Sequence, residues 1–370
     1  MVKMGVHALA VGLSIAPVGL LLLSTALPAQ QAQHYMQTNL VADTMGPAGA
    51  VDSNLVNPWG VSRSSGSPWW VSDNGTGVAT LYGGAGNAIP LVVTIPAAVS
   101  GQTGTPTGQV FNGTTDFELA KGKPALFIFA TADGTISGWN PNVKPTTAVI
   151  KVNTKSASVF KGLAEATVMD GEHGPTNYLY AADFRKGQVD VFDTNFHRVF
   201  FPNAFDDTRI PEGFAPFNVQ NIGGNIYVAF AKQDSQKHDE IDGAGLGFVD
   251  VFSPTGRLLR RLQSGRFFNA PWGMAQAPSD FGAYSHDILI GQFGSGAILV
   301  FDPVTGSFKD SLRDAKNGSI KIDGLWSIAF GGGTTSGPSN TLFFTAGTDR
   351  QQHGLFGAIT AIENVLGGDQ

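Results

Sequence analysis

The sequence contains no cysteine and has little charge. With no cysteine among 370 residues, disulfide scaffolds, cysteine-ligated metal sites and cysteine nucleophiles are excluded. Charged residues make up 14% and hydrophobic residues 42%, a balance typical of a globular chain and not of a disordered one. Lys and Arg number 23 against 29 Asp and Glu, for a net charge of -6. Because no basic surface is indicated, we expect no nucleic-acid partner.

Long apolar runs are absent beyond the N-terminus. Lys3 precedes an apolar run over 8–23 that Pro17 interrupts, and small residues follow it. This pattern is typical of an export signal, and the run is shorter than the roughly 20 residues that a membrane-spanning helix needs. We therefore predict a signal peptide at 1–29, with a retained N-terminal anchor as the alternative. The mature chain is expected to be secreted or periplasmic, without a membrane span.

Glycine and proline, in contrast, are abundant and divide the chain into repeats. The 48 Gly and 20 Pro residues predict many tight turns between short strands. An aromatic or large apolar residue opens each of six similar units. These opening residues are Trp59, Phe117, Leu163, Phe217, Trp272 and Trp326.

Each unit continues with further strands that are rich in β-branched and aromatic residues. Second strands are predicted at 69–72, 125–129, 178–181, 225–229, 287–290 and 341–344, and third strands at 77–82, 134–139, 187–192, 247–252, 296–301 and 357–362. More polar fourth strands follow at 91–95, 147–152, 198–201, 258–263 and 307–312. Val189 and Val191 alternate with Asp190, which indicates that the third strands have one buried and one wetter side.

Six units of up to four strands predict an all-β fold, a six-bladed β-propeller. The sixth unit lacks a fourth strand, and residues 36–41 alternate as a strand before the first unit. We therefore predict that this N-terminal strand closes the last blade and pairs with 357–362. The propeller is expected to span 30–363 as a single domain, followed by a C-terminal tail at 364–370. A pair of β-sandwiches is the alternative.

Several segments also match a known family. They include NPWGV (57–61), VSDNGTGVATLY (71–82), YAADFRKGQVDVFD (180–193) and APWGMA (270–275). With these and similar stretches the chain resembles a family of uncharacterised exported bacterial β-propellers, whose architecture is related to that of NHL-repeat proteins. The resemblance covers nearly the entire mature chain. It implies the propeller fold and export, and it implies no activity.

Polar residues recur where the second strands end, and these tips are expected to converge around a polar central channel. The predicted ligand-binding residues are Asp73, Asn74, Asp133, Asp183, Arg185, Lys232, Asp234, Gln292, Asp349 and His353. Solvated hairpin tips are the alternative interpretation of the same residues. The tryptophans at one repeat position favour packing between blades over a sugar-stacking platform.

The fourth unit carries a long polar insertion at 233–245. Insertions of this length are typical of functional lids or of solvated loops. Its Asp239, Glu240 and Asp242 could hold Ca²⁺, although their spacing does not follow an EF-hand loop. A solvated charged loop is the favoured interpretation.

Two functions remain open from the sequence. The favoured one is a binding module, expected to be a monomer, that holds a small molecule, a glycan or a protein on the channel face. The alternative is a hydrolase or lactonase with an axial Ca²⁺, an analogy that rests on fold alone. Convergence of Asp73, Asp133, Asp183, Gln292 and Asp349 on one point would favour the enzyme.

Overall fold

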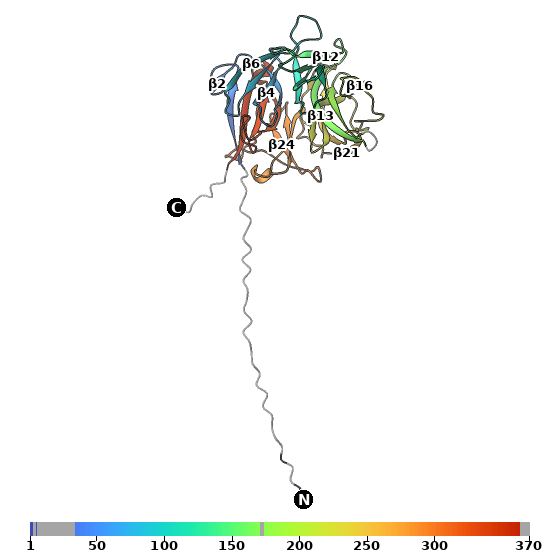
Figure 1. Ribbon diagram of the computed structural model, residues 1–370. Coiled ribbons are helices and arrows are strands. Elements are labelled where there is room, and N and C mark those ends of the chain that lie inside the picture. Colours follow the sequence, from blue (N-terminus) through green and yellow to red (C-terminus); the bar gives the residue numbers. More distant parts are fainter. Residues whose placement is uncertain (3–4, 6–33, 171–173, 363–370) are drawn as a thin grey trace. The chain divides into compact units, whose positions relative to one another are not determined.

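Six antiparallel sheets are arranged as the blades of a β-propeller in the part of the chain that the structure describes (Figure 1). The structure is a computed structural model that describes residues 1–2, 5, 34–170 and 174–362. Except for residues 1–2 and 5, the predicted signal peptide lies outside these ranges, as does the predicted tail at 364–370. Residues 31–370 form one unit and 1–30 another. No helix within the described ranges is both long enough and apolar enough to cross a membrane.

In blades 1 to 5 the strand that comes first in the chain is the innermost, and in blade 6 the innermost strand is β26 (Leu325–Phe330). Blade 1 contains β3 (Pro58–Ser62), β4 (Trp69–Asp73), β5 (Val78–Tyr82) and β6 (Ala88–Thr94). Blade 2 contains β7 (Pro106–Phe111), β10 (Phe127–Thr131), β11 (Thr135–Trp139) and β12 (Val149–Asn153), with a small ribbon of β8 (Glu118–Ala120) and β9 (Lys123–Pro124) inserted after its first strand. Blade 3 contains β13 (Phe160–Asp170), β14 (Gly174–Asp183), β15 (Gln188–Phe192) and β16 (Arg198–Val199).

The remaining blades follow the same order. Blade 4 contains β17 (Phe214–Ile222), β18 (Asn225–Gln233), β20 (Phe248–Phe252) and β21 (Leu258–Arg261), and the short β19 (Glu240–Ile241) pairs with β18. Blade 5 contains β22 (Pro271–Gln276), β23 (Ile288–Gln292), β24 (Ile298–Phe301) and β25 (Phe308–Ser311), with a 3-10 turn η1 at Gly282–Tyr284. Blade 6 contains β26 (Leu325–Phe330), β27 (Leu342–Ala346) and β28 (Leu355–Ile362), with the helical turn α1 at Thr348–Gln351.

Blade 6 is completed by the N-terminal strand β1 (His34–Ala42), as predicted. β1 pairs antiparallel with β28, from His34 opposite Ile362 to Ala42 opposite Leu355, and Figure 1 shows the blue strand beside the red ones. A short strand β2 (Ala50–Val51), which the sequence pattern did not predict, pairs parallel with β1. Closing the ring in this way joins its two ends and removes an open strand edge.

Neighbouring inner strands approach so closely that only small residues fit between them. A Cβ on Gly60 would lie 2.5 Å from the carbonyl oxygen of Thr107, and one on Gly108 would lie 2.4 Å from the amide nitrogen of Leu163. Side chains also join the blades across this ring, as where the Asn218 amide donates to the Trp272 carbonyl at 2.7 Å. The inner strands therefore form a tight ring around the propeller axis.

The axis of this ring is filled by aromatic side chains and is not the polar channel that the sequence indicated. One buried cluster draws residues from all six blades, so it lies on the axis. Its members are Trp59, Ala132, Val159, Phe184, Ala215, Phe217, Ala231, Ala270, Trp272 and Trp326, with Phe293 packed against them. The prediction that the tryptophans pack between blades is confirmed, and the prediction of an open polar hole is wrong because those rings occupy it.

Two of the predicted opening residues were misplaced. The inner-strand position held by Trp59, Phe217, Trp272 and Trp326 in four blades is held by Thr107 in β7 and by Lys161 in β13. Phe117 instead lies in the loop between β7 and β8, and Leu163 lies two residues further along β13. This inner-strand position holds residues of varied type, whereas the residue directly after it is small. Close packing of the inner strands limits the size of the second residue and not that of the first.

The third strands do not have the wetter side that their alternation indicated. Asp190 of β15 and Asp250 of β20 are both buried, because each blade is covered on both faces by its neighbours. Each carboxylate meets an arginine of the outer strand: Arg198 lies 2.7 Å from Asp190, and Arg261 lies 3.2 Å from Asp250. Ion pairing between strands compensates this burial of charge.

Candidate functional site

The aromatic cluster leaves a cavity at each end of the axis. Inner strands begin where second strands end, as with Pro58 opposite Asp73 and Leu325 opposite Ala346. The end with these second-strand tips is called the tip mouth here, and the end where the inner strands finish is called the broad mouth. The sequence pointed to the tip mouth.

The tip mouth is a cavity of about 410 Å³. It is lined by Trp59, Asn74, Thr105, Ala132, Asp133, Lys161, His238, Asp239 and Gln351. His238 and Asp239 belong to the 233–245 insertion, which therefore reaches the axis. The insertion is anchored where Glu240 and Ile241 of β19 pair with Gln233 and Lys232 of β18.

Two of the predicted ligand-binding residues line this cavity. The Asn74 side chain donates to the Pro106 carbonyl at 3.1 Å and accepts from the Asn57 amide at 3.3 Å. The Asp133 carboxylate accepts from the backbone amides of Ala98 and Thr105. Both side chains are therefore fixed by the surrounding loops.

Three other predicted residues lie in the same ring of tips but are fully buried. Asp73 accepts from the Thr80 hydroxyl at 2.7 Å, and burial raises the pKa of this carboxyl well above its usual range. Asp183 accepts from the amide of Val159 at 3.3 Å, and Gln292 accepts from that of Asn269 at 2.8 Å.

These contacts explain why polar residues recur at the ends of the second strands. Val159 immediately precedes β13, and Asn269 lies two residues before β22. Asp183 and Gln292 therefore each hold the segment that leads into the inner strand of their own blade. This arrangement satisfies backbone amides that would otherwise be buried without a partner.

The other five predicted residues are engaged away from the cavity. Arg185 donates to the Ser156 carbonyl, Lys232 donates to that of Glu212, and Asp234 accepts from the amide of His238. The backbone amide of Asp349 donates to Asp323. Nδ1 of His353 lies 2.8 Å from Oδ2 of Asp43, and this hydrogen bond raises the pKa of the imidazole.

The calcium alternative requires acidic side chains that converge on one point. Within residues 34–170 and 174–362, no group of three or more His, Asp or Glu side chains is arranged to hold a metal ion. The insertion carboxylates form no such group within these ranges either, and that of Asp239 is paired with the Lys161 ammonium at 2.9 Å. The acidic tips therefore brace the loops and do not form an axial cation site among the described side chains.

The sequence reasoning missed the most unusual residue of the tip mouth, which is Lys161. Its side chain is 1% exposed, and its ammonium lies 4.8 Å from the ring centroid of Trp59. Strained backbone lies at the same mouth, where Gln351 also lines the cavity. Asp349, Arg350 and Gln351 are consecutive non-glycine residues with φ of 49°, 55° and 68°. Left-handed conformations of this kind cost of order 1–3 kcal/mol each and cluster at functional sites.

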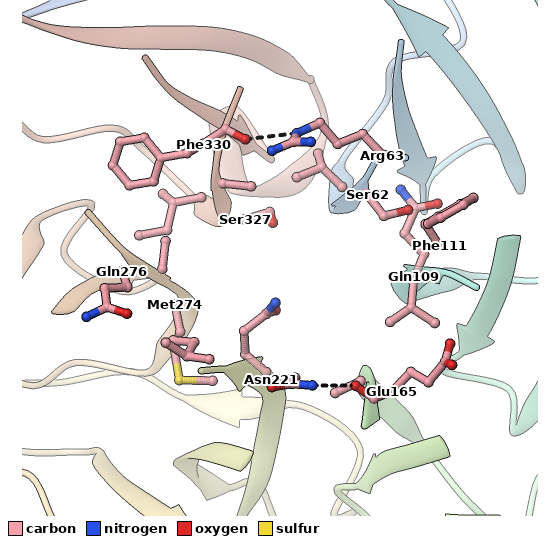
Figure 2. Close-up of a pocket in the computed structure, with 18 of the residues that line it drawn as sticks. Ser62, Arg63, Gln109, Phe111, Glu165, Asn221, Met274, Gln276, Ser327 and Phe330 are labelled. Atoms are coloured by element: carbon pink, nitrogen blue, oxygen red, sulfur yellow. Dashed lines mark hydrogen bonds between the residues drawn. The ribbon is translucent and has the colours of Figure 1, made fainter. Parts of the chain in front are cut away.

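The broad mouth, which the sequence reasoning also missed, is a larger cavity of about 520 Å³. Residues of all six inner strands line it, at the strand ends except for Ala164 and Glu165 in the middle of β13, and Figure 2 shows the labelled side chains in a ring around the opening. Apolar side chains of Val61, Val110, Ala164, Met274, Ala275, Ile328 and Ala329 contribute much of the wall. The Gln220 side chain is exposed, the Gln276 amide donates to the His286 carbonyl at 3.1 Å, and Asn221 donates to the Glu165 carbonyl.

Charged groups at the broad mouth are neutralised or already bonded. The Arg63 guanidinium donates to the carbonyls of Phe330 at 3.0 Å and Gly331 at 2.9 Å, and Figure 2 shows the first contact. Burial, with a smaller contribution from Asp116, raises the pKa of Glu165 to about 7. The cavity therefore offers apolar surface and amides, together with a cation whose donors are engaged and a carboxyl that is only partly ionised near pH 7.

The chain is similar in sequence to uncharacterised proteins. No family model matches it, so its resemblance to exported bacterial propellers stays a prediction. Two uncharacterised proteins of Acanthamoeba polyphaga mimivirus are each 32% identical, one over 330 residues (86% of this chain, 78% of the relative) and one over 322 residues (83% and 81%). Among solved structures, a glucose dehydrogenase has a TM-score of 0.53 at 12% identity and covers 89% of this chain and 99% of its own. At that identity the likeness shows the fold alone.

Proposed function

We propose that this chain, which belongs to the same family as the two uncharacterised mimivirus proteins, is a module that binds a small uncharged ligand at its broad mouth. The observation that carries this proposal is the composition of that cavity. Side chains from all six inner strands form its wall, which presents apolar and polar surface together, and the exposed Gln220 side chain stands at its rim. A cavity of about 520 Å³ falls within the range usual for small-molecule sites.

The lining indicates which kind of ligand fits. Because Arg63 donates to backbone carbonyls and the pKa of Glu165 is raised to about 7, the Arg63 donors are already engaged and Glu165 is only partly ionised near neutral pH, which favours a ligand without a net charge. Apolar walls and amide groups complement a molecule with an apolar face and several hydroxyls, such as a neutral saccharide of one or two rings. Phe111 and Phe330, which also line the cavity, supply aromatic surface of the kind on which sugar rings pack.

Binding is favoured over catalysis because the lining offers one ionisable acid and no partner for it. General acid–base catalysis needs a titratable side chain within hydrogen-bond reach of the reacting atoms, and reactions that need both an acid and a base use a second such group. Glu165 is the one carboxyl among the residues that line the broad mouth.

The test is a binding titration with neutral and charged sugars. Glucose and maltose are titrated by calorimetry and by saturation-transfer NMR, with glucuronate as the charged comparison. We expect millimolar or tighter binding of a neutral sugar. The variant Gln220→Ala should weaken it several-fold, since a lost hydrogen bond contributes roughly 0.5–1.5 kcal/mol.

The matched control is Gln236→Ala, which removes an exposed amide in the 233–245 insertion and should leave binding unchanged. If glucuronate binds as well as the neutral sugars, or if Gln220→Ala binds as tightly as the unmodified protein, the assignment of the ligand class to this cavity is wrong.

A further inference from the structure

Lys161 is the charged member of a ring position that is otherwise aromatic or neutral. The equivalent inner-strand residues in the other blades are Trp59, Thr107, Phe217, Trp272 and Trp326. Its ammonium is enclosed beside the rings of Trp59 at 4.8 Å and Phe184 at 5.9 Å. An ammonium held in such surroundings requires a negative partner to offset its lost hydration.

The negative partner of Lys161 is Asp239, which belongs to the 233–245 insertion and not to an inner strand. Oδ1 of Asp239 lies 2.9 Å from the Lys161 ammonium, although 61% of the Asp239 side chain is exposed. The second oxygen of the same carboxylate lies 3.0 Å from Nδ1 of His238. The segment that carries Asp239 is held by the two-residue strand β19 and by hydrogen bonds of its own, such as that from the Asp234 amide to the Asp239 carbonyl at 2.8 Å. The exposed Asp239 side chain can therefore leave the ammonium by rotation while its backbone stays in place.

Two indole N–H donors near the axis also lack a hydrogen-bond acceptor in the described part of the chain. The buried indole nitrogens of Trp59 and Trp272 have no hydrogen-bond partner among the described residues, and Trp59 lines the cavity. A buried donor without an acceptor costs free energy. Together with the ammonium, the Trp59 indole N–H complements an anion.

Two other carboxyl groups lie near the ammonium, and neither opposes an anion strongly. The carboxylate of Asp133 accepts from two backbone amides. Burial raises the pKa of Glu240, with Lys161 acting in the opposite direction, so this carboxyl is shifted toward its neutral form.

We propose that the tip mouth is a second binding site, specific for a small monocarboxylate, and that Asp239 occupies it internally. The ligand carboxylate replaces that of Asp239 on the Lys161 ammonium, and the exposed Asp239 side chain turns toward solvent. The group now bound to Lys161 fixes the ligand class, because a single ammonium already holds a single carboxylate there. Asn74, Thr105 and Gln351 on the cavity wall supply polar contacts for the rest of the molecule.

The experiment uses acetate as the probe and Asp239→Asn as the main variant. This substitution removes the competing carboxylate and leaves the ammonium without its anion. Melting temperature and tryptophan fluorescence are followed while sodium chloride is replaced by sodium acetate at constant ionic strength. Fluorescence reports on the site because Trp59 lies against the ammonium.

We expect Asp239→Asn to bind acetate about tenfold more tightly than the unmodified protein, and acetate to raise its melting temperature further than that of either control. The controls are the unmodified protein and Asp280→Asn, which removes an exposed carboxylate from another loop. Equal responses in all three proteins would reveal a general salt effect and overturn the proposal.

A second substitution tests the ammonium itself. Lys161→Met in the Asp239→Asn background keeps an unbranched side chain among the rings and removes the charge. We expect the acetate response to disappear, and a response that persists without Lys161 would contradict the site. Neither outcome depends on the broad mouth, so the result is independent of the sugar titration.

Discussion

The indole rings of Trp59 and Trp326 stack with their centroids 3.5 Å apart and an interplanar angle of 21°. The two residues belong to the first and the last blade, 267 residues apart in the chain. The stack therefore joins the beginning and the end of the propeller at its axis. Trp326 also donates its indole N–H to the side chain of Asn57 at 3.0 Å, which fixes the ring in place.

Removal of this ring should destabilise the whole propeller. We expect Trp326→Ala to lower the free energy of unfolding by about 3–5 kcal/mol, because it leaves a cavity in the core. Denaturant unfolding followed by circular dichroism measures the change. Phe200→Ala is the control, since Phe200 is 80% exposed and its loss should change stability by less than about 0.5 kcal/mol.

The close approach of the inner strands predicts a strong effect of a single methyl group. In Gly108→Ala the new Cβ would lie 2.4 Å from the backbone of Leu163, so the two strands must separate. We expect a loss of about 1–3 kcal/mol or more in unfolding free energy. Gly49→Ala is the matched control, because no atom lies within 4 Å of its Cβ position; equal stability of the two variants would contradict the tight ring.

The N-terminal strand should be essential for a stable ring. A chain that begins at residue 44 lacks β1 and exposes the edge of β28. It also lacks the Tyr35 hydroxyl, which donates to the Phe281 carbonyl at 2.9 Å. We expect a lower melting temperature and concentration-dependent aggregation, because open strand edges pair with other chains. Light scattering and thermal unfolding against a chain that begins at residue 31 measure both effects, and matching behaviour of the two chains would exclude closure by β1.

Glu165 should make stability depend on pH. Its pKa in the folded protein is about 7, above the usual value of 4.5, so the folded state binds more protons than the unfolded state between these values. The free energy of unfolding therefore falls as pH rises from 4.5 to 7, by at most about 1.4 kcal/mol per pH unit from this group. Glu165→Gln should flatten that slope, whereas Glu212→Gln, which alters an exposed side chain, should retain it.

The candidate sites were only partly predictable, because sequence repeats report packing more directly than function. Polar residues at the second-strand tips were identified, but Asp183 and Gln292 serve the loops that enter their own blades. Lys161 was overlooked because the repeats were aligned on aromatic residues. Alignment on the small residue that follows, as in Lys161-Gly162 and Trp272-Gly273, would have placed a charged side chain in the axial ring.

The sequence by itself determined the number of blades, the order of strands within each blade and the closure of the last blade by residues near the N-terminus. These follow from local patterns, since strand period, turn residues and repeat length can all be recognised in consecutive residues of the sequence. Only the tertiary structure decided what fills the axis and which side chains line its two mouths. Those residues come from six blades, and their meeting depends on the close packing of the inner strands and the direction of each side chain, which no single segment encodes.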